Sequence, residues 1–182
     1  MIVVEALTHD ERVAVARLRA LLELLPTALD RHLTDAGLTS FEFSLLEALF
    51  EADHHRLRLT ALAARTNATL PRLSRVVTGL EKKGLVGKAA CEQDGRATNA
   101  VLTDSGERAY LDNRPHFENA VREMILSALD PGGVQRLADI SYAILSKLDP
   151  DRRLAVTTDG SAEDCDADPR RCAADPAPRR GS

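Results

Sequence analysis

Aromatic residues and cysteines are scarce in this sequence of 182 residues, which has no Trp, four Phe, two Tyr and three Cys. So few aromatic residues favour a helical core built from Ala, Leu and Val over an aromatic-rich sheet. The three cysteines, Cys91, Cys165 and Cys172, are too scattered for a disulfide framework, which agrees with a reducing compartment. No apolar run approaches the roughly 20 residues that span a bilayer, and the first residues, MIVVEALTHDER, do not resemble a secretory signal. We therefore expect a cytoplasmic protein.

Catalytic and cofactor-binding signatures are also missing. The sequence contains no GxSxG, Walker loop, GxGxxG or HExxH motif. His54 and His55 are adjacent, and neighbouring residues on a helix point about 100° apart, so they rarely bind one metal ion together. Cys165 and Cys172 lack the short spacing of a zinc site. These absences predict a protein that is not an enzyme and that has no cofactor or metal.

The net charge of -4 hides a strong asymmetry along the chain. Residues 1–54 hold four Arg and ten Asp or Glu, whereas residues 55–110 hold ten Lys or Arg and five Asp or Glu. A local basic surface attracts a polyanion even when the whole chain is acidic. The middle of the chain is therefore the candidate for contact with nucleic acid, although an ordinary solvated surface would show the same charge.

Apolar residues at helical spacing predict long helices on both sides of this basic segment. These helices are expected over about residues 10–36, 104–129 and 131–149. Thr39, followed by Glu42, forms a capping box that predicts the start of a shorter helix. After Pro150 the sequence is rich in Asp, Arg, Ala and Pro and poor in large apolar residues. We therefore expect one folded domain over residues 1–150 and a disordered tail over residues 151–182.

Two short helices are predicted close together within the basic segment. Thr60 is expected to cap the first of them, and Asn67 to end it in a left-handed conformation. Thr69 is expected to cap the second, with Pro71 in the first turn, where a missing N–H is harmless. So short a connection between two helices is typical of a helix-turn-helix.

A hairpin is predicted directly after the second helix. Gly84 stops that helix, and residues 85–90 and 98–102 read as two short strands joined by a polar turn. Residues 39–103 thus predict a winged helix-turn-helix lobe. The expected fold class is mainly α with a small β-hairpin wing, and the remaining helices form a helical dimerisation region.

The second helix carries the residues that we expect to contact DNA. A recognition helix presents polar side chains from its first turns to the major groove. The candidates are Thr69, Pro71, Arg72, Ser74 and Arg75. An arginine can bind guanine through two hydrogen bonds, and Ser or Thr can bind phosphate or base edges. On an isolated helix these arginines would be only a solvated face, so the surrounding helix-turn-helix and wing decide the interpretation.

The hairpin and its base supply further candidates. Arg96 at the thin turn suits the narrow minor groove, and Asp94 is expected to pair with an arginine and hold the shape of the turn. Lys82, Lys83 and Lys88 are candidate phosphate contacts. Cys91 is either an incidental residue or a thiol activated by Lys88.

These motifs resemble the MarR family of winged helix-turn-helix regulators over about residues 10–149. The resemblance is carried by Leu73-Ser74-Arg75 through Leu80-Glu81-Lys82-Lys83-Gly84-Leu85-Val86, by Asp94-x-Arg96 and by Leu102-Thr103-x-x-Gly106. It implies a homodimer that binds double-stranded DNA at a pseudo-palindromic operator, with the second helix in the major groove. One departure is Gly95, where many members have a basic or polar residue, so the wing has fewer cations.

The resemblance also implies regulation by a small molecule. Family members often respond to phenolic or lipophilic anions bound between the dimer helices and the DNA-binding lobe. Arg19, His32 and His116 are the candidates that we would place near such an effector, although an ordinary, partly exposed position is the more common role for each of these residue types. The alternative function is a winged-helix protein-interaction module that does not bind DNA, and the basic segment favours the DNA-binding function.

Overall fold

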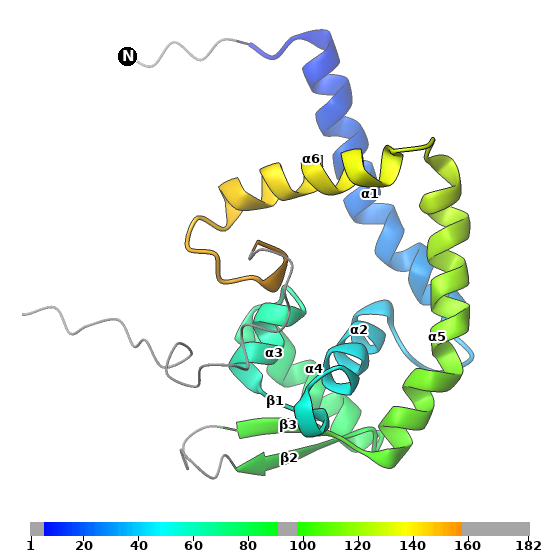
Figure 1. The fold of residues 1–182 in the computed structure, drawn as a ribbon, viewed down its shortest axis with the longest axis vertical. Helices are drawn as coiled ribbons and strands as arrows, with labels where there is room; N and C mark the ends of the chain where they lie inside the picture. Colours follow the sequence, from blue (N-terminus) through cyan, green and yellow to red (C-terminus); the bar gives the residue numbers. More distant parts are fainter. Residues whose placement is uncertain (1–5, 91–97, 158–182) are drawn as a thin grey trace, which may run out of the picture.

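The chain folds into a helical body with a small sheet at one end (Figure 1). The computed structural model describes residues 6–90 and 98–157. Its main elements are α1 (His9–His32), α2 (Ser40–Phe50), β1 (Arg56–Arg58), α3 (Leu59–Arg65), α4 (Leu70–Lys82), β2 (Val86–Ala90), β3 (Thr98–Leu102), α5 (Asp104–Met124) and α6 (Gly133–Leu148). Short 3-10 helices occur at Asp53–His55, Leu126–Ala128 and Ala155–Thr157. The predicted fold class, mainly α with a β-hairpin, is confirmed.

The sheet has three antiparallel strands in the order β1-β3-β2. Ala100 of β3 pairs with Lys88 of β2 on one side and with Leu57 of β1 on the other. Strand β1 was not predicted from the sequence. Three residues are too few to display a strand periodicity, and what identifies β1 is its pairing with β3, which lies far along the chain.

Helix α2 forms the centre of the core. Phe43, Leu45, Leu46 and Leu49 are completely buried, and each such side chain contributes about 1.5–3 kcal/mol when it leaves water. The ring of Phe43 lies 5.3 Å from that of Tyr110 on α5. This contact joins α2 to the long helix that runs from the sheet end of the molecule towards α6 (Figure 1).

Side-chain caps fix the starts of several helices. The capping box predicted at Thr39 and Glu42 is confirmed, because Thr39 Oγ1 accepts from the N–H of Glu42 at 3.1 Å and the Glu42 carboxylate accepts from the N–H of Thr39 at 2.9 Å. The cap predicted at Thr60 is wrong, since Arg58 is the N-cap of α3 and makes no side-chain capping bond. Strand β1 leads straight into α3, so the helix starts earlier than a hydroxyl-capped helix would.

Several helix ends differ from their predicted positions. Helix α1 ends at His32, before the turn that Gly37 closes with φ of 63°, and the N–H of Leu33 bonds the oxygen of Asp30 instead of continuing the helix. Pro26 lies inside α1 without ending it. Helix α5 ends at Met124, and a 3-10 turn replaces its predicted last turn.

The first residues after α6 are ordered, although they were predicted to begin a disordered tail. Asp149 accepts hydrogen bonds from the N–H groups of Arg153 and Leu154 and from the hydroxyl of Thr157, and these contacts hold the pKa of its carboxyl below the usual range. Thr157 is buried. This turn brings Ala155–Thr157 back against α3 (Figure 1). Residues 158–182 lie outside the described part of the chain.

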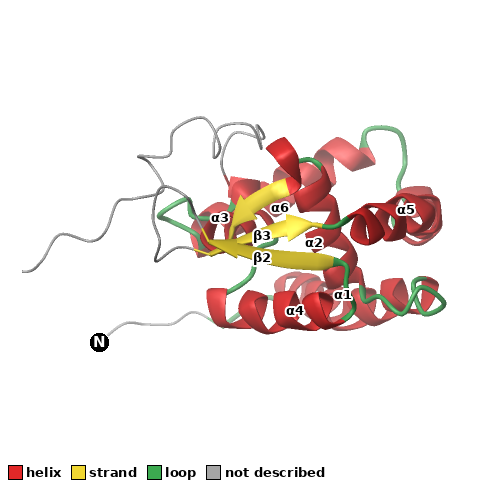
Figure 2. Cartoon of the chain, turned by 90° about the horizontal axis from the view of Figure 1, so that it is seen from below, coloured by secondary structure: helices red, strands yellow, loops and turns green. Residues whose placement is uncertain are grey.

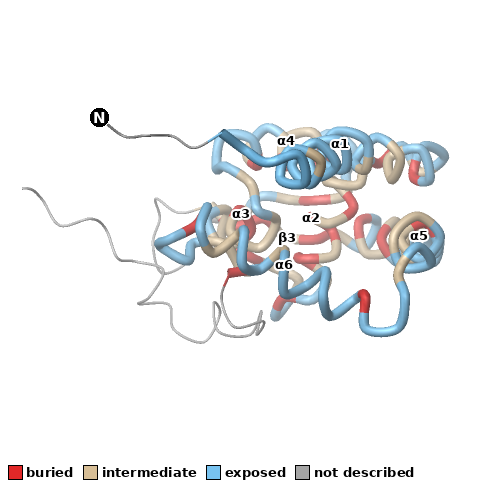
Figure 3. Tube along the Cα trace, turned by 90° about the horizontal axis from the view of Figure 1, so that it is seen from above, coloured by how far each residue is buried: buried red, intermediate tan, exposed pale blue. Residues whose placement is uncertain are grey.

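Helices α1 and α6 contribute little to the core. Helix α1 has no buried residue, and α6 buries only Gly133. Figure 3 shows both largely exposed. Within residues 6–90 and 98–157, no helix combines the length and the hydropathy that a membrane crossing requires.

Candidate nucleic-acid interface

The connection between α3 and α4 has the geometry of a helix-turn-helix. Asn67 adopts φ of 52°, which is the left-handed conformation predicted for this position. The N–H of Ala68 donates to the oxygen of Ala63 at 2.9 Å, and that of Asn67 donates to the oxygen of Ala64 at 3.4 Å. These two bonds close the end of α3 and turn the chain sharply, so that α4 begins almost immediately at Leu70.

Thr69 occupies the N-cap of α4, as predicted. Its backbone is extended, and its side chain makes no capping hydrogen bond. Pro71 lies in the first turn, where its missing N–H costs nothing. The exposed N–H groups of this helix start suit an anion such as a DNA phosphate.

The other end of α4 is tied to the base of the wing. Gly84 has φ of 72°, and the N–H of Leu85 donates to the oxygen of Leu80 at 3.0 Å. The hydroxyl of Thr103 donates to the oxygen of Gly84 at 2.7 Å and accepts from the N–H of Gly106 at 3.0 Å. A methyl group on Gly106 would overlap the backbone oxygen of Leu85. The glycines and the threonine of the two sequence motifs therefore meet at one junction.

Helix α4 has a sharply divided surface. Leu73, Val77 and Leu80 are fully buried, while Pro71 and Arg75 on the opposite side are exposed. In Figure 2, α4 runs beside β2, with which it makes contact. Thr78 and Lys82 share the outward face with Arg75. Lys82 was predicted as a phosphate contact, whereas Thr78 was not predicted as a contact, although its helical spacing from Arg75 could have identified it.

The two arginines of α4 have different surroundings. The guanidinium carbon of Arg72 lies 4.2 Å from the ring centroid of Phe41 on α2. Arg75 Nε donates to the oxygen of Pro71 at 3.3 Å, so its side chain lies along its own helix. Arg72 is thus held at the side of α4, while Arg75 stands on the outward face. Ser74, half-buried, accepts at its backbone oxygen from the hydroxyl of Thr78 at 2.9 Å.

Two of the three lysines predicted as phosphate contacts, Lys83 and Lys88, have partners within the protein. Lys83 Nζ donates to Glu42 Oε1 at 2.7 Å and to the oxygen of Gly37 at 2.8 Å. Lys88 Nζ donates to Glu81 Oε2 at 2.8 Å and to Thr78 Oγ1 at 2.9 Å. Each ammonium group therefore links α4 to a neighbouring element, Lys83 to α2 and Lys88 to β2.

The remaining predicted residues fall into two groups. Asp94 and Arg96, with Cys91, lie outside the described residues. Arg19 and His32 are exposed on α1, and His116 is exposed on α5. The structure brings none of these last three into the cavity of about 310 Å³ beside α2.

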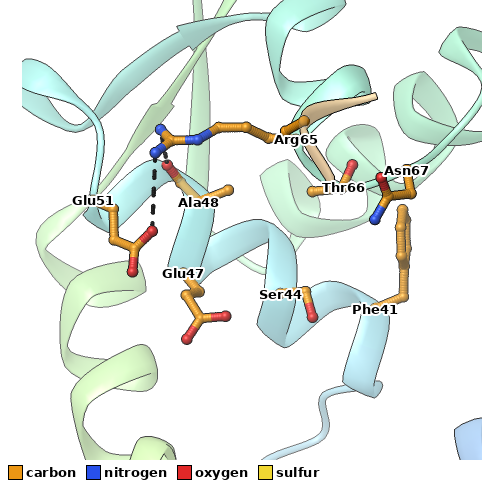
Figure 4. Close-up of a pocket in the computed structure, with 9 residues that line it drawn as sticks. Phe41, Ser44, Glu47, Ala48, Glu51, Arg65, Thr66 and Asn67 are labelled. Atoms are coloured by element: carbon orange, nitrogen blue, oxygen red, sulfur yellow. Dashed lines mark hydrogen bonds and ion pairs between the residues drawn. The ribbon is translucent and has the colours of Figure 1, made fainter. Parts of the chain in front are cut away.

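That cavity lies between α2, the end of α3 and the C-terminal turn (Figure 4). It is lined by Phe41, Ser44, Glu47, Ala48, Glu51, Arg65, Thr66, Asn67 and Ala155. Arg65 spans it by donating to the oxygen of Ala48 at 3.4 Å and pairing with Glu51 at 3.9 Å. Burial, together with the nearby Glu51 carboxylate, raises the pKa of Glu47. No cluster of three or more metal-ligating side chains occurs among the residues that the structure describes.

Both the sequence and the fold are similar to those of known transcriptional regulators. Residues 38–98 match the family model described as "MarR family". The crystal structure of Sco3205, a MarR family transcriptional regulator from Streptomyces coelicolor in complex with DNA, has a TM-score of 0.76 and 34% identity, covering 79% of this chain and 91% of that chain. The crystal structure of AbsC, a MarR family transcriptional regulator of the same organism, has a TM-score of 0.75 and 30% identity. The match covers 79% of this chain and 97% of that chain.

A curated relative agrees with these structures. The HTH-type transcriptional repressor YetL of Bacillus subtilis (strain 168) is 32% identical over 79 residues, which are 43% of this chain. The alignment spans about half, 47%, of the Bacillus protein. Identity of 34% over nine-tenths of a MarR family regulator, on a matching fold, establishes that the chain belongs to the MarR family of transcriptional regulators.

Proposed function

We propose that the chain is a cytoplasmic, ligand-responsive repressor that binds a pseudo-palindromic operator as a homodimer. The outward face of α4 is the observation that carries this proposal. Arg75 stands exposed there, opposite a fully buried stripe, and backbone turns at both helix ends fix the helix in the lobe. Such a helix can enter the major groove without disturbing the core behind it.

The proposed DNA contacts divide by chemistry. Arg72 and Arg75 carry the fork of donors that binds guanine through two hydrogen bonds. Thr69 and Ser74 suit phosphate or base edges, and the exposed start of α4 suits a phosphate. In the wing we propose a minor-groove contact for Arg96, with Asp94 holding the turn.

Homodimerisation is supported by the apolar surface of α1 and α6. Leu21 and Leu22 on α1 are 59% and 69% exposed, and Ile140 on α6 is 60% exposed. Monomeric proteins rarely leave large contiguous apolar patches in water. A two-fold dimer through these helices would present two copies of α4 to successive major grooves, about 34–36 Å apart.

The effector is proposed to act through this spacing. A small phenolic or lipophilic anion near Arg19, His32 and His116 would favour a dimer geometry in which the two recognition helices no longer match the DNA, which lowers affinity by population shift. Addition of candidate anions to a preformed complex tests this step. Release of DNA is expected, and an unchanged dissociation constant across a panel of such anions would remove the effector from the proposal.

The binding site itself is tested on DNA selected from a random pool. The double variant Arg75→Ala with Arg96→Ala is expected to abolish specific binding, while Arg122→Ala with Arg136→Ala removes the same charge from α5 and α6 and should bind normally. Retention of specific binding by the first variant would overturn the site. The selected sequences should contain two inverted half-sites, and a single half-site protected by one protomer would contradict the dimeric mode.

A further inference from the structure

The carboxylate that caps α2 also holds the end of the recognition helix. Glu42 Oε2 accepts from the N–H of Thr39 at 2.9 Å, while Oε1 accepts from Lys83 Nζ at 2.7 Å. Lys83 is the C-cap of α4, and it also donates to the oxygen of Gly37 at 2.8 Å. The side chain of Glu42 is only 13% exposed. Lys83 therefore bonds a largely buried carboxylate and a carbonyl oxygen at the same time.

The first turn of α2 holds α4 at its other end too. Phe41, the neighbour of Glu42, lies under the guanidinium of Arg72 in the first turn of α4. One residue earlier, both the N–H and the hydroxyl of Ser40 donate to Asp30 Oδ1 at 2.6 Å. Asp30 belongs to α1. Three consecutive residues of α2 thus connect α1 with both ends of α4.

We propose that Lys83 is a positioning residue for DNA binding and acts through Glu42, rather than being a phosphate contact. This inference rests on the proposed docking of α4 in the major groove. To reach a phosphate, Lys83 would have to give up a charge-assisted hydrogen bond. Bound to Glu42 and Gly37, Lys83 instead fixes the tilt of α4. This tilt sets the distance between the DNA and the side chains of Arg72 and Arg75, and hydrogen bonds weaken steeply outside about 2.7–3.2 Å. A movement of α1 would shift α4 through its contacts with Ser40, Phe41 and Glu42.

The two possible roles of Lys83 predict opposite effects for Glu42→Gln. If Lys83 binds phosphate, removal of the neighbouring negative charge leaves DNA affinity unchanged or raises it. If Lys83 positions α4 through Glu42, the same change weakens DNA binding although the protein becomes more positive. The Gln side-chain oxygen can still accept from the N–H of Thr39, so the cap of α2 is retained.

The experiment measures DNA affinity against salt concentration for wild type, Lys83→Met, Glu42→Gln and the double variant. Each single variant is expected to lose roughly threefold to tenfold in affinity, with the double variant no weaker than Lys83→Met, since the two residues act as a unit. The slope of log affinity against log salt should stay as in wild type, because a lost phosphate contact would lower it by about 0.9. Lys83→Arg should restore binding. Lys82→Met removes an exposed cation from the outward face of α4 and is the comparison for a lysine on the DNA-facing side, whose loss should lower the salt slope.

A second readout needs no DNA. Amide hydrogen exchange at the C-terminal end of α4 should rise in Lys83→Met and Glu42→Gln, but not in Lys82→Met, while circular dichroism confirms that all variants are folded. A shallower salt slope for Lys83→Met, or DNA binding by Glu42→Gln as tight as wild type, would overturn the positioning role. Failure of the wild type to bind any selected DNA would overturn the proposed function instead, and the exchange data would still decide whether Lys83 fixes α4.

Discussion

Arg72 of α4 lies over the ring of Phe41, with its guanidinium carbon 4.2 Å from the ring centroid. The two residues come from α4 and α2, so the contact is created by tertiary packing. An arginine held over an aromatic face loses less side-chain freedom on binding than one that moves in solvent. Phe41 also lines the cavity beside α2. A molecule that filled this cavity and moved the Phe41 ring would therefore also move Arg72.

Replacement of Phe41 by Leu is expected to weaken DNA binding about twofold to fivefold, because an exposed cation–π contact contributes about 0.5–1 kcal/mol. Fluorescence anisotropy with operator DNA measures the loss. Phe41→Tyr keeps the aromatic face and should bind as wild type does. Equal binding by the Leu variant would show that the stack does not prepare Arg72 for DNA.

The junction between the wing and α5 should not tolerate a side chain at position 106. In Gly106→Ala the new methyl group would overlap the backbone oxygen of Leu85 and approach Leu102 Cδ1 to 2.8 Å. Overpacking of this kind costs about 1–3 kcal/mol or more, and urea denaturation measures the cost. Gly79→Ala is the matched control, since its methyl group meets nothing within 4 Å and should stabilise α4 by about 0.5–1 kcal/mol. Similar midpoints for both variants would contradict the steric argument.

Charge on the apolar stripe of α6 should dissociate the proposed dimer. Ile144, 40% exposed, lies on the same side of the helix as Ile140 and Leu148. Ile144→Lys places a charge in the interface, so sedimentation velocity should detect a monomer, and operator affinity should fall at least tenfold as bivalent binding is lost. Gln135→Lys adds the same charge to the opposite side of α6 and should remain dimeric. A dimeric Ile144→Lys variant would place the interface elsewhere.

Ionisation of Glu47 should lower the stability of the protein as the pH rises. Burial and the adjacent Glu51 raise the pKa of Glu47 above its ordinary value, so the folded state favours the protonated carboxyl. Ionisation of Glu47 therefore opposes folding above its raised pKa, and this penalty fades as the pH falls through that pKa. Glu47→Gln should accordingly be more stable than wild type at pH 7, and the difference should shrink towards pH 4. Urea unfolding at both pH values, with exposed Glu23→Gln as the control, checks the sign; a destabilised Gln variant at pH 7 would refute it.

Local sequence signals correctly predicted several features of the helix-turn-helix and the elements beside it. Asn67 was expected in a left-handed conformation, Gly84 was expected to stop α4, and Thr39 with Glu42 was expected to form a capping box. Each of these features depends on residues a few positions apart. Strand β1 could not be found in this way, since Leu57 is a strand residue only through its pairing with Ala100. The ordered turn after α6 was missed for a similar reason: Asp149 and Thr157 are polar in sequence and become buried only by bonding each other.

The buried stripe of α4 and the arginines on its other faces could be predicted from the sequence, because helical periodicity acts over one or two turns. The tertiary structure decided what each cation does. Lys83 and Lys88 look alike in the sequence as free basic residues, yet both are held by carboxylates, and Glu42, the partner of Lys83, lies on another helix. Arg72 and Arg75 also look equivalent in the sequence, but only Arg72 packs against Phe41. Contacts between residues distant in the chain exist only after the helices have packed, so they leave no local pattern from which a sequence could predict them.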